Sequence, residues 1–154
     1  IIPKYLYDCS GNSYRDEKDS IKNIIRTNEF KRLEIVWIDK LDMIHKQIKI
    51  LLARYKKLFK LLNIPLDIVK VESWTQANNI NSYTYDFCSN GLEVLNLSNN
   101  HTLFTKKFNI KDKSNEILYS ACSGIGLSRL IYTFLKANGF ESSLWPTCIK
   151  LNSK

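Results

Sequence analysis

Arginines, carboxylates and a phenylalanine recur at regular spacing in the segment YRDEKDSIKNIIRTNEFKRLE, residues 14–34. Arg15 and Glu17 are two positions apart, so on a strand their side chains face the same way. Even spacing predicts four further side chains on one face of a second strand: Arg26, Phe30, Arg32 and Glu34. An arginine can bind a phosphate through two parallel hydrogen bonds, and a phenyl ring can stack on adenine. The segment therefore predicts a floor for ATP; the alternative is an outward-facing strand held by salt bridges.

A second candidate element is the segment CSGIGLSRL, residues 122–130. Gly124 and Gly126 allow the backbone to come close to a ligand or to another strand. Arg129 then falls in the first turn of an expected helix, where an anion is favoured. The pattern is weak alone, but it adds an independent second element to the predicted site.

The intervening segment GLEVLNLSNNH, residues 91–101, carries oxygen donors. Glu93, Asn96 and Ser98 are of the type that Mg²⁺ prefers. The alternative interpretation is an edge strand with polar side chains.

Hydrophobic periodicity and turn residues predict the elements that would position these groups. In chain order we expect strands at 13–18 and 28–38 joined by a polar loop, a helix at 40–62, strands at 66–74, 82–88 and 91–98 with an Asn90-Gly91 turn, a strand or returning loop at 103–110, a strand at 117–122 and a helix at 125–138. Strands outnumber helices and do not alternate with them. The predicted fold class is therefore α+β with an antiparallel sheet.

The helix at 40–62 is the strongest of these predictions. Asp39 is the expected cap at its start, and Asn63 and Pro65 are expected to end it. Its polar face carries Lys46, Lys49, Lys56, Lys57 and Lys60. That stripe could contact RNA, and the alternative is an ordinary solvated helix face.

Length and composition are consistent with one globular domain over residues 1–154. A net charge of +8 favours polyanion partners such as tRNA, although lysine-rich coding from an AT-rich genome is an equal explanation. No apolar run is long enough to span a bilayer, and the N-terminal residues do not resemble a signal peptide. The four cysteines form no CxxC pair, which indicates a reducing compartment. We therefore expect a cytoplasmic protein without a membrane partner.

Taken together, these segments resemble the class II aminoacyl-tRNA synthetases. Arg15-x-Glu17, the loop and Arg26-x3-Phe30-x3-Glu34 resemble motif 2, and residues 124–129 resemble motif 3. The stretch 93–110 is similar to the seryl-tRNA synthetase segment between those motifs. The likeness is strongest to the atypical, methanogen-type seryl enzymes, to which bacterial amino acid:carrier protein ligases are related. It covers about residues 5–146 and implies an antiparallel sheet flanked by helices.

The resemblance implies a role for each site residue. Arg15 would hold the α-phosphate and the amino acid carboxylate, and Phe30 would stack on adenine. The other implied contacts are Glu17 to the adenine amine, Arg26 and Arg129 to the outer phosphates, and Glu93 and Asn96 to Mg²⁺.

The resemblance also implies a zinc ion that recognises the amino acid. Its ligands in the family are two cysteines and the glutamate that ends motif 2, and Glu34 and Cys122 match two of them. The first cysteine is expected upstream of motif 2 at an interval that Cys9 does not meet. Motif 1 and any tRNA-binding domain are likewise expected upstream of residue 1.

The implied activity is ATP-dependent activation of an amino acid, with serine favoured, as an aminoacyl adenylate. The expected cofactors are ATP, Mg²⁺ and Zn²⁺, and the expected assembly is a homodimer. Three hypotheses remain open: a seryl-tRNA synthetase-like enzyme with tRNA as acceptor, an amino acid:carrier protein ligase with an acyl-carrier protein as acceptor, and a non-catalytic paralogue.

Overall fold

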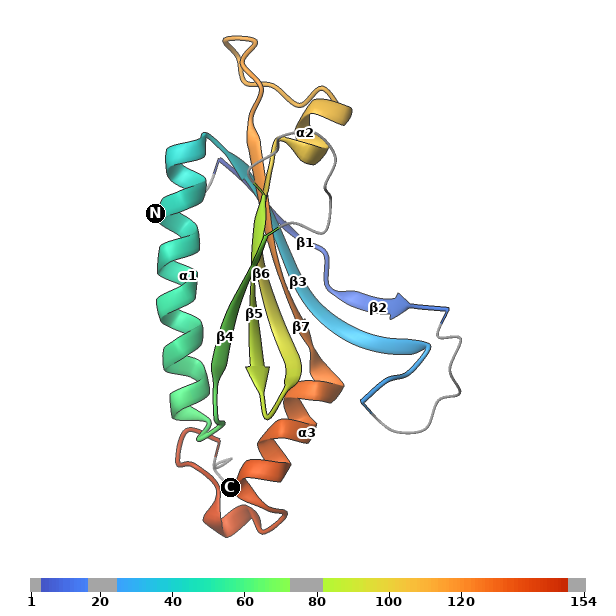
Figure 1. The fold of residues 1–154 in the computed structure, drawn as a ribbon, viewed down its shortest axis with the longest axis vertical. Coiled ribbons are helices and arrows are strands. Elements are labelled where there is room, and N and C mark those ends of the chain that lie inside the picture. Colours follow the sequence, from blue (N-terminus) through green and yellow to red (C-terminus); the bar gives the residue numbers. More distant parts are fainter. Residues whose placement is uncertain (1–3, 17–24, 73–81, 150–154) are drawn as a thin grey trace, which may run out of the picture.

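The computed structural model describes residues 4–16, 25–72 and 82–149, and its centre is an antiparallel sheet (Figure 1). Neighbouring strands follow the order β1-β3-β7-β6-β5-β4, and β2 also pairs with β3. The strands are β1 (Tyr5–Asp8), β2 (Gly11–Tyr14), β3 (Glu29–Asp39), β4 (Asp67–Glu72), β5 (Tyr83–Ser89), β6 (Leu92–His101) and β7 (Tyr119–Gly126). The helices are α1 (Leu41–Leu61), α2 (Leu103–Lys107), α3 (Leu127–Asn138) and the short 3-10 helix η1 (Ser142–Leu144). The predicted α+β class is confirmed.

Strand register gives the sheet one apolar and one polar face. Glu34 pairs with Gly124, and Gly124 pairs with Asn96, so these positions lie in one row across β3, β7 and β6. Residues opposite each other in an antiparallel sheet share a face, so the row faces one way and its sequence neighbours face the other. The other face carries the buried side chains of Trp37, Phe87, Leu95, Leu97 and Ala121.

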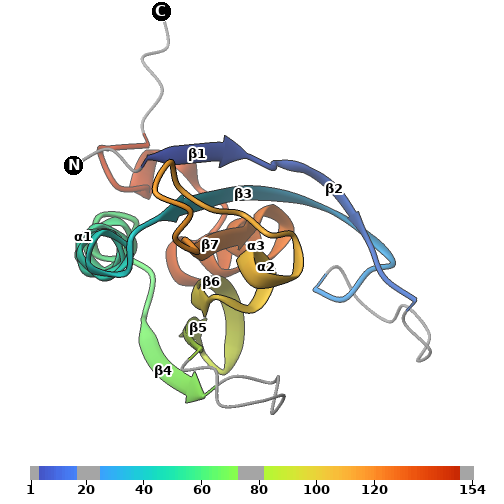
Figure 2. The ribbon, with the colours of Figure 1, turned by 90° about the horizontal axis from the view of Figure 1, so that it is seen from above.

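Helices α1 and α3 close the core on the apolar side. Ile44, Ile48 and Phe59 of α1 are at most 3% exposed, and Phe134 of α3 joins the same cluster. Figure 2 shows α1 beside the sheet, while β2 and the start of β3 curve away on the other side. This curved pair, the β2–β3 arm, overhangs the polar face.

The start of α1 differs from the prediction. Asp39 is the last residue of β3, and its buried carboxylate accepts hydrogen bonds from the N–H groups of Lys4 and Lys40, both at 2.8 Å. Lys40 is the N-cap residue and makes no side-chain capping bond. The expectation of an Asp39 cap was therefore wrong, because the strand continues up to the helix. The predicted end is confirmed, since Asn63 has a φ of 53° and the N–H of Ile64 donates to the carbonyl of Phe59 at 3.0 Å.

Several other boundaries also differ. Segment 103–110, predicted as a strand or a returning loop, begins with helix α2. Strand β1 was not predicted, and β2 spans four residues instead of 13–18. Helix α3 begins at Leu127 because β7 continues through Gly126. The Asn90-Gly91 turn is confirmed, with φ values of 51° and 77°. Within the described ranges, none of the helices combines the length and apolarity needed to cross a membrane.

Candidate active site

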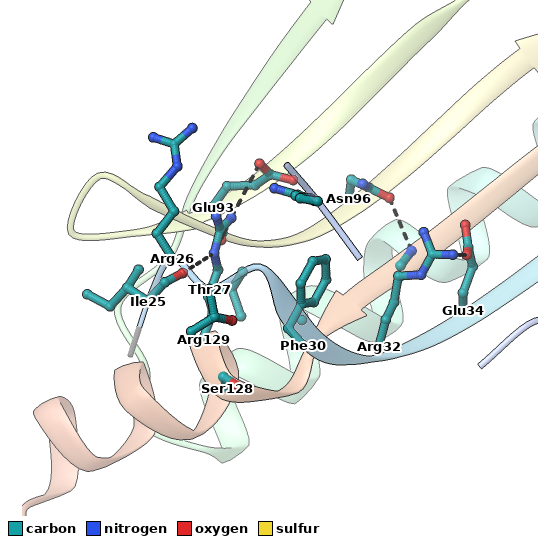
Figure 3. A pocket seen from close by; sticks show the side chains of 14 residues that line it. Ile25, Arg26, Thr27, Phe30, Arg32, Glu34, Glu93, Asn96, Ser128 and Arg129 are labelled. Atoms are coloured by element: carbon teal, nitrogen blue, oxygen red, sulfur yellow. Dashed lines mark hydrogen bonds and ion pairs between the residues drawn. The ribbon is translucent and has the colours of Figure 1, made fainter. Parts of the chain in front are cut away.

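An open pocket lies where the β2–β3 arm meets the first turn of α3 (Figure 3). Seven of the predicted site residues line it: Arg15, Arg26, Phe30, Glu34, Glu93, Asn96 and Arg129. Glu17 lies outside the described residues, and Cys122 is not among the lining residues. Segments that are up to about a hundred residues apart in sequence therefore converge on one site, as the two motifs predicted.

Strand β3 supplies the central part of the floor by simple alternation. Phe30, Arg32 and Glu34 are half-buried and line the pocket, whereas their neighbours Lys31 and Leu33 are exposed. The even-spacing argument was wrong for Arg26, because β3 begins only at Glu29. Arg26 nevertheless lines the pocket, from the segment that leads into the strand.

Arg129 connects three parts of the site. Its Nε donates to the carbonyl of Ile25 at 3.2 Å, and its Nη1 donates to the carbonyl of Glu93 at 2.9 Å. The same Nη1 lies 3.7 Å from a carboxylate oxygen of Glu93. The arginine lies in the first turn of α3, as predicted, and it holds the segment before β3 against the start of β6. The guanidinium of Arg129 is thereby fixed near the N-terminus of α3, where the helix dipole and the unpaired backbone N–H groups favour an anion.

Arg15 and Phe30 form a stacked pair. The guanidinium carbon of Arg15 lies 4.7 Å from the centroid of the Phe30 ring, within the range of a cation–π contact. The backbone N–H of Arg15 donates to the carbonyl of Asn28 at 2.8 Å, which fixes the position of the residue just after β2. Both residues line the pocket, and in this structure the guanidinium of Arg15 covers one face of the Phe30 ring.

A glycine leaves the pocket floor between β6 and β7 without a projecting side chain. The side-chain oxygen of Asn96 accepts a hydrogen bond from the N–H of Gly124 at 3.1 Å. A Cβ at Gly124 would lie 3.5 Å from that oxygen and 3.7 Å from Cδ of Arg32. Gly124 thus leaves the space above Asn96 open.

The implied zinc ligands each have another partner. Glu34 forms an ion pair with Arg32, and Cys122 accepts a hydrogen bond from the side-chain amide of Asn100 at 3.5 Å. Burial raises the pKa of the Cys122 thiol, which disfavours the thiolate that zinc requires. No group of three or more His, Cys, Asp or Glu side chains within the described residues could hold a metal ion. The described donors do not fit the zinc site that the resemblance implies, and we derive no step through zinc.

Some lining residues were not predicted as site residues. Arg32 was placed on the correct face but given no role; its Nε is buried without a hydrogen-bond partner, and its spacing from Phe30 and Glu34 was the available signal. Thr27 and Ser128 also line the pocket. Nothing in the local sequence pattern distinguishes them.

The polar face of this antiparallel sheet brings together arginines of the β2–β3 arm and an arginine of helix α3, which follows β7. This combination is characteristic of the core of a class II aminoacyl-tRNA synthetase. Residues 2–138 match the family model of the tRNA synthetase class II core domain (G, H, P, S and T). The chain belongs to this family, as its motifs predicted.

The sequences of curated relatives align with most of this chain. The type-2 serine–tRNA ligases of Methanothrix thermoacetophila and Methanococcoides burtonii are 32% identical over 160 residues and 30% identical over 163 residues. Each alignment covers 94% of this chain and 32% of the relative. The chain therefore spans about a third of the length of the relatives that it matches, and the likeness to methanogen-type seryl enzymes is confirmed.

Solved structures give the same fold. The M. kandleri SerRS, in a complex with A. aeolicus tRNASec, superposes with a TM-score of 0.78 at 25% identity, over 95% of this chain and 33% of that one. The Giardia lamblia prolyl-tRNA synthetase in complex with prolyl-adenylate gives a TM-score of 0.68 at 19% identity, over 84% of this chain and 27% of that one. The second likeness shows the fold alone, and both agree with the predicted class II sheet.

Proposed function

We propose that the pocket binds ATP and activates serine as seryl adenylate, as part of a seryl-tRNA synthetase-like ligase that uses tRNA as acceptor. The observation that carries the proposal is the convergence of Arg15, Phe30 and Arg129 on one open pocket. The relatives named serine–tRNA ligases favour serine and tRNA over other substrates.

The site residues would act by positioning and by charge. Adenine would stack on Phe30, which requires the guanidinium of Arg15 to leave the ring face that it now covers. Arg15 would then bind the α-phosphate, while Arg26 and Arg129 bind the outer phosphates, because guanidinium groups favour phosphate oxygens. Arg129 needs little rearrangement for this role, since two backbone carbonyls already hold it.

The reaction would be an in-line displacement at the α-phosphorus. A carboxylate oxygen of serine forms the new bond to phosphorus as the bond to the bridging oxygen breaks, and pyrophosphate leaves with that electron pair. No protein nucleophile takes part. The protein holds the reactants in line and stabilises the charge on the phosphoryl oxygens.

The pocket also offers oxygen donors to Mg²⁺. Glu93 and Asn96 both line it beside the arginines, and carboxylate and amide oxygens suit this ion. When bound, Mg²⁺ supplies further positive charge to the polyphosphate. Glu93 would also keep Arg129 in place through the contact between their side chains.

Amino-acid-dependent exchange of pyrophosphate into ATP tests the proposal, with serine, glycine and alanine compared in the presence of Mg²⁺. Exchange is expected with serine. Arg15→Ala should reduce it by about 100-fold or more, the usual effect of removing one charge-stabilising donor, while the fold stays intact. Arg54→Ala, on the exposed face of α1, is the matched control and should exchange normally.

Each other result has a defined meaning. Glycine- or alanine-dependent exchange would move the proposal to an amino acid:carrier protein ligase. No exchange from the folded protein would favour the non-catalytic paralogue, and normal exchange by Arg15→Ala would refute the proposed site. Sedimentation equilibrium would test the proposed homodimer.

A further inference from the structure

Helix α1 lies beside the sheet (Figures 1 and 2), and its exposed side carries a row of lysines. Its members are Lys46, Lys49, Lys56, Lys57 and Lys60, all exposed. At about 100° per residue, these five positions fall within an arc of about 100°. The row extends about 21 Å along the axis, at about 1.5 Å per residue. We refer to it below as the lysine row.

The charge of the lysine row is barely compensated. Helix α1 carries six lysines and arginines against one carboxylate, Asp42, in a chain of net charge +8. Asp42 lies 3.8 Å from Lys46, and among the described residues no ion pair involves the other four lysines of the row. A surface of this kind attracts polyanions, and its effect is concentrated on one helix.

The apolar side of α1 argues against a membrane as the partner of the lysine row. Amphipathic helices bind membranes by placing their apolar face in the lipid, so that face must be free. In α1 it is not free, because Ile44, Ile48 and Phe59 are almost fully buried against the sheet. The lysine row is therefore presented on a fixed helix whose apolar face is already buried against the sheet, which suits the phosphate backbone of a nucleic acid.

We infer that the lysine row is a docking surface for the phosphate backbone of RNA, distinct from the ATP pocket. The inference rests on the proposed function for the choice of RNA, because the proposed acceptor is tRNA. Helix α1 packs on the apolar face of the sheet, whereas Glu34, Gly124 and Asn96 form a row on the other face. The RNA segment on α1 is therefore not the segment that would reach the pocket, and it contributes affinity without entering the chemistry.

The test compares two triple variants that remove the same charge. Lys49→Gln, Lys56→Gln and Lys60→Gln together remove three members of the lysine row. Lys106→Gln, Lys107→Gln and Lys113→Gln together remove three exposed lysines from α2 and the loop after it. Binding of a tRNASer transcript and of a 12-base-pair RNA duplex is measured between 50 and 250 mM KCl, with the melting temperature as the check on folding.

The row variant is expected to bind both RNAs at least tenfold more weakly at low salt. The slope of log K against log salt should become shallower by about 0.7–0.9 for each phosphate that the variant no longer neutralises. The control triple should leave both quantities nearly unchanged. Equal weakening by the two triples, or no weakening by the row variant, would overturn the inference.

Two further measurements separate this inference from the proposed function. Pyrophosphate exchange needs no RNA, so the row variant should keep it; loss of RNA binding with normal exchange is the expected pair of results. Absent exchange in the unmodified protein, with RNA binding that still depends on the row, would remove the proposed function and leave the docking surface. Sedimentation with phosphatidylserine vesicles but no binding to either RNA would overturn the inference in favour of a membrane surface.

Discussion

Arg129 is held in place by its surroundings before any ligand arrives. Backbone carbonyls of Ile25 and Glu93 accept its hydrogen bonds, and the Glu93 carboxylate lies 3.7 Å away. A lysine can keep the charge but has no planar fork with which to reach both carbonyls. The structure therefore separates the role of charge at this position from the role of geometry.

Arg129→Lys should accordingly lower serine-dependent exchange by about 100-fold, although the charge is retained. Much of the loss should appear as a higher KM for ATP, because the contact between Ile25 and the start of β6 is weakened. Lys136→Gln, at the exposed end of the same helix, serves as the control and should be neutral. A fully active Arg129→Lys protein would show that the geometry of this arginine is unimportant.

Asp86 is a carboxylate that the fold does not stabilise. It pairs across the sheet with Asn96, and within the described residues no hydrogen bond or ion pair involves its side chain. Burial, followed by the nearby charge of Glu93, raises its pKa above the ordinary value of 3.8. The folded protein therefore binds this proton more tightly than the unfolded chain, so stability falls as pH rises from 3.8 through the raised pKa.

Asp86→Asn should for this reason be more stable than the unmodified protein at pH 7, with the advantage shrinking as pH falls toward 4. Urea denaturation midpoints across this range measure the effect. Asp67→Asn, at an exposed position on the neighbouring β4, is the comparison and should change the midpoint little. An Asp86→Asn variant that is less stable at pH 7 would mean that the carboxylate has a stabilising partner.

At the scale of the elements, strand β7 illustrates how the pocket stays open. A methyl group at Gly124 would make only ordinary contacts, at 3.5 Å to Asn96 and 3.7 Å to Arg32, so Gly124→Ala should fold and melt normally. The methyl group would nevertheless stand on the pocket floor. A methyl-sized misfit is worth about 10–200-fold in recognition, so we expect the KM for ATP to rise by about tenfold or more. An unchanged KM would place ATP away from this floor.

Alternation explains why much of the site could be predicted from sequence. Phe30, Arg32 and Glu34 share a face because β3 is regular, and Arg129 follows β7 directly into α3. Arg26 was predicted on that face for the wrong reason, because the position of a residue before a strand depends on loop geometry and not on a period of two.

The missed elements depend on contacts between distant segments. Strand β1 has four exposed residues, and it is a strand only because it pairs with Val36 and its neighbours on β3. Helix α2 is a five-residue helix, too short for its periodicity to be read. The prediction of Asp39 as a helix cap was wrong because strand β3, which is paired in the sheet, extends one residue further than local propensity indicates. Pairing of this kind is decided by tertiary structure and leaves little local signal.

At the scale of the whole molecule, the two sides of the sheet would have different functions, ATP binding on one side and RNA binding on the other. The polar side carries the pocket, and the apolar side is covered by helices whose outer surface bears the lysine row. The chain spans about a third of the length of its curated relatives. The proposed adenylate site is the part of that account whose residues line one pocket of this chain.

Calorimetric titration with a non-hydrolysable seryl sulfamoyl adenosine tests that site most directly. We expect one site per chain and an affinity at least about 100-fold above that for serine, because the analogue fills the adenine, phosphate and amino acid positions together. Arg15→Ala should weaken binding at least tenfold, because Arg15 is the proposed partner of the α-phosphate position that the sulfamoyl group occupies, and the control Arg54→Ala should not. A folded protein that fails to bind the analogue, or that binds it equally well without Arg15, would contradict the proposed adenylate site.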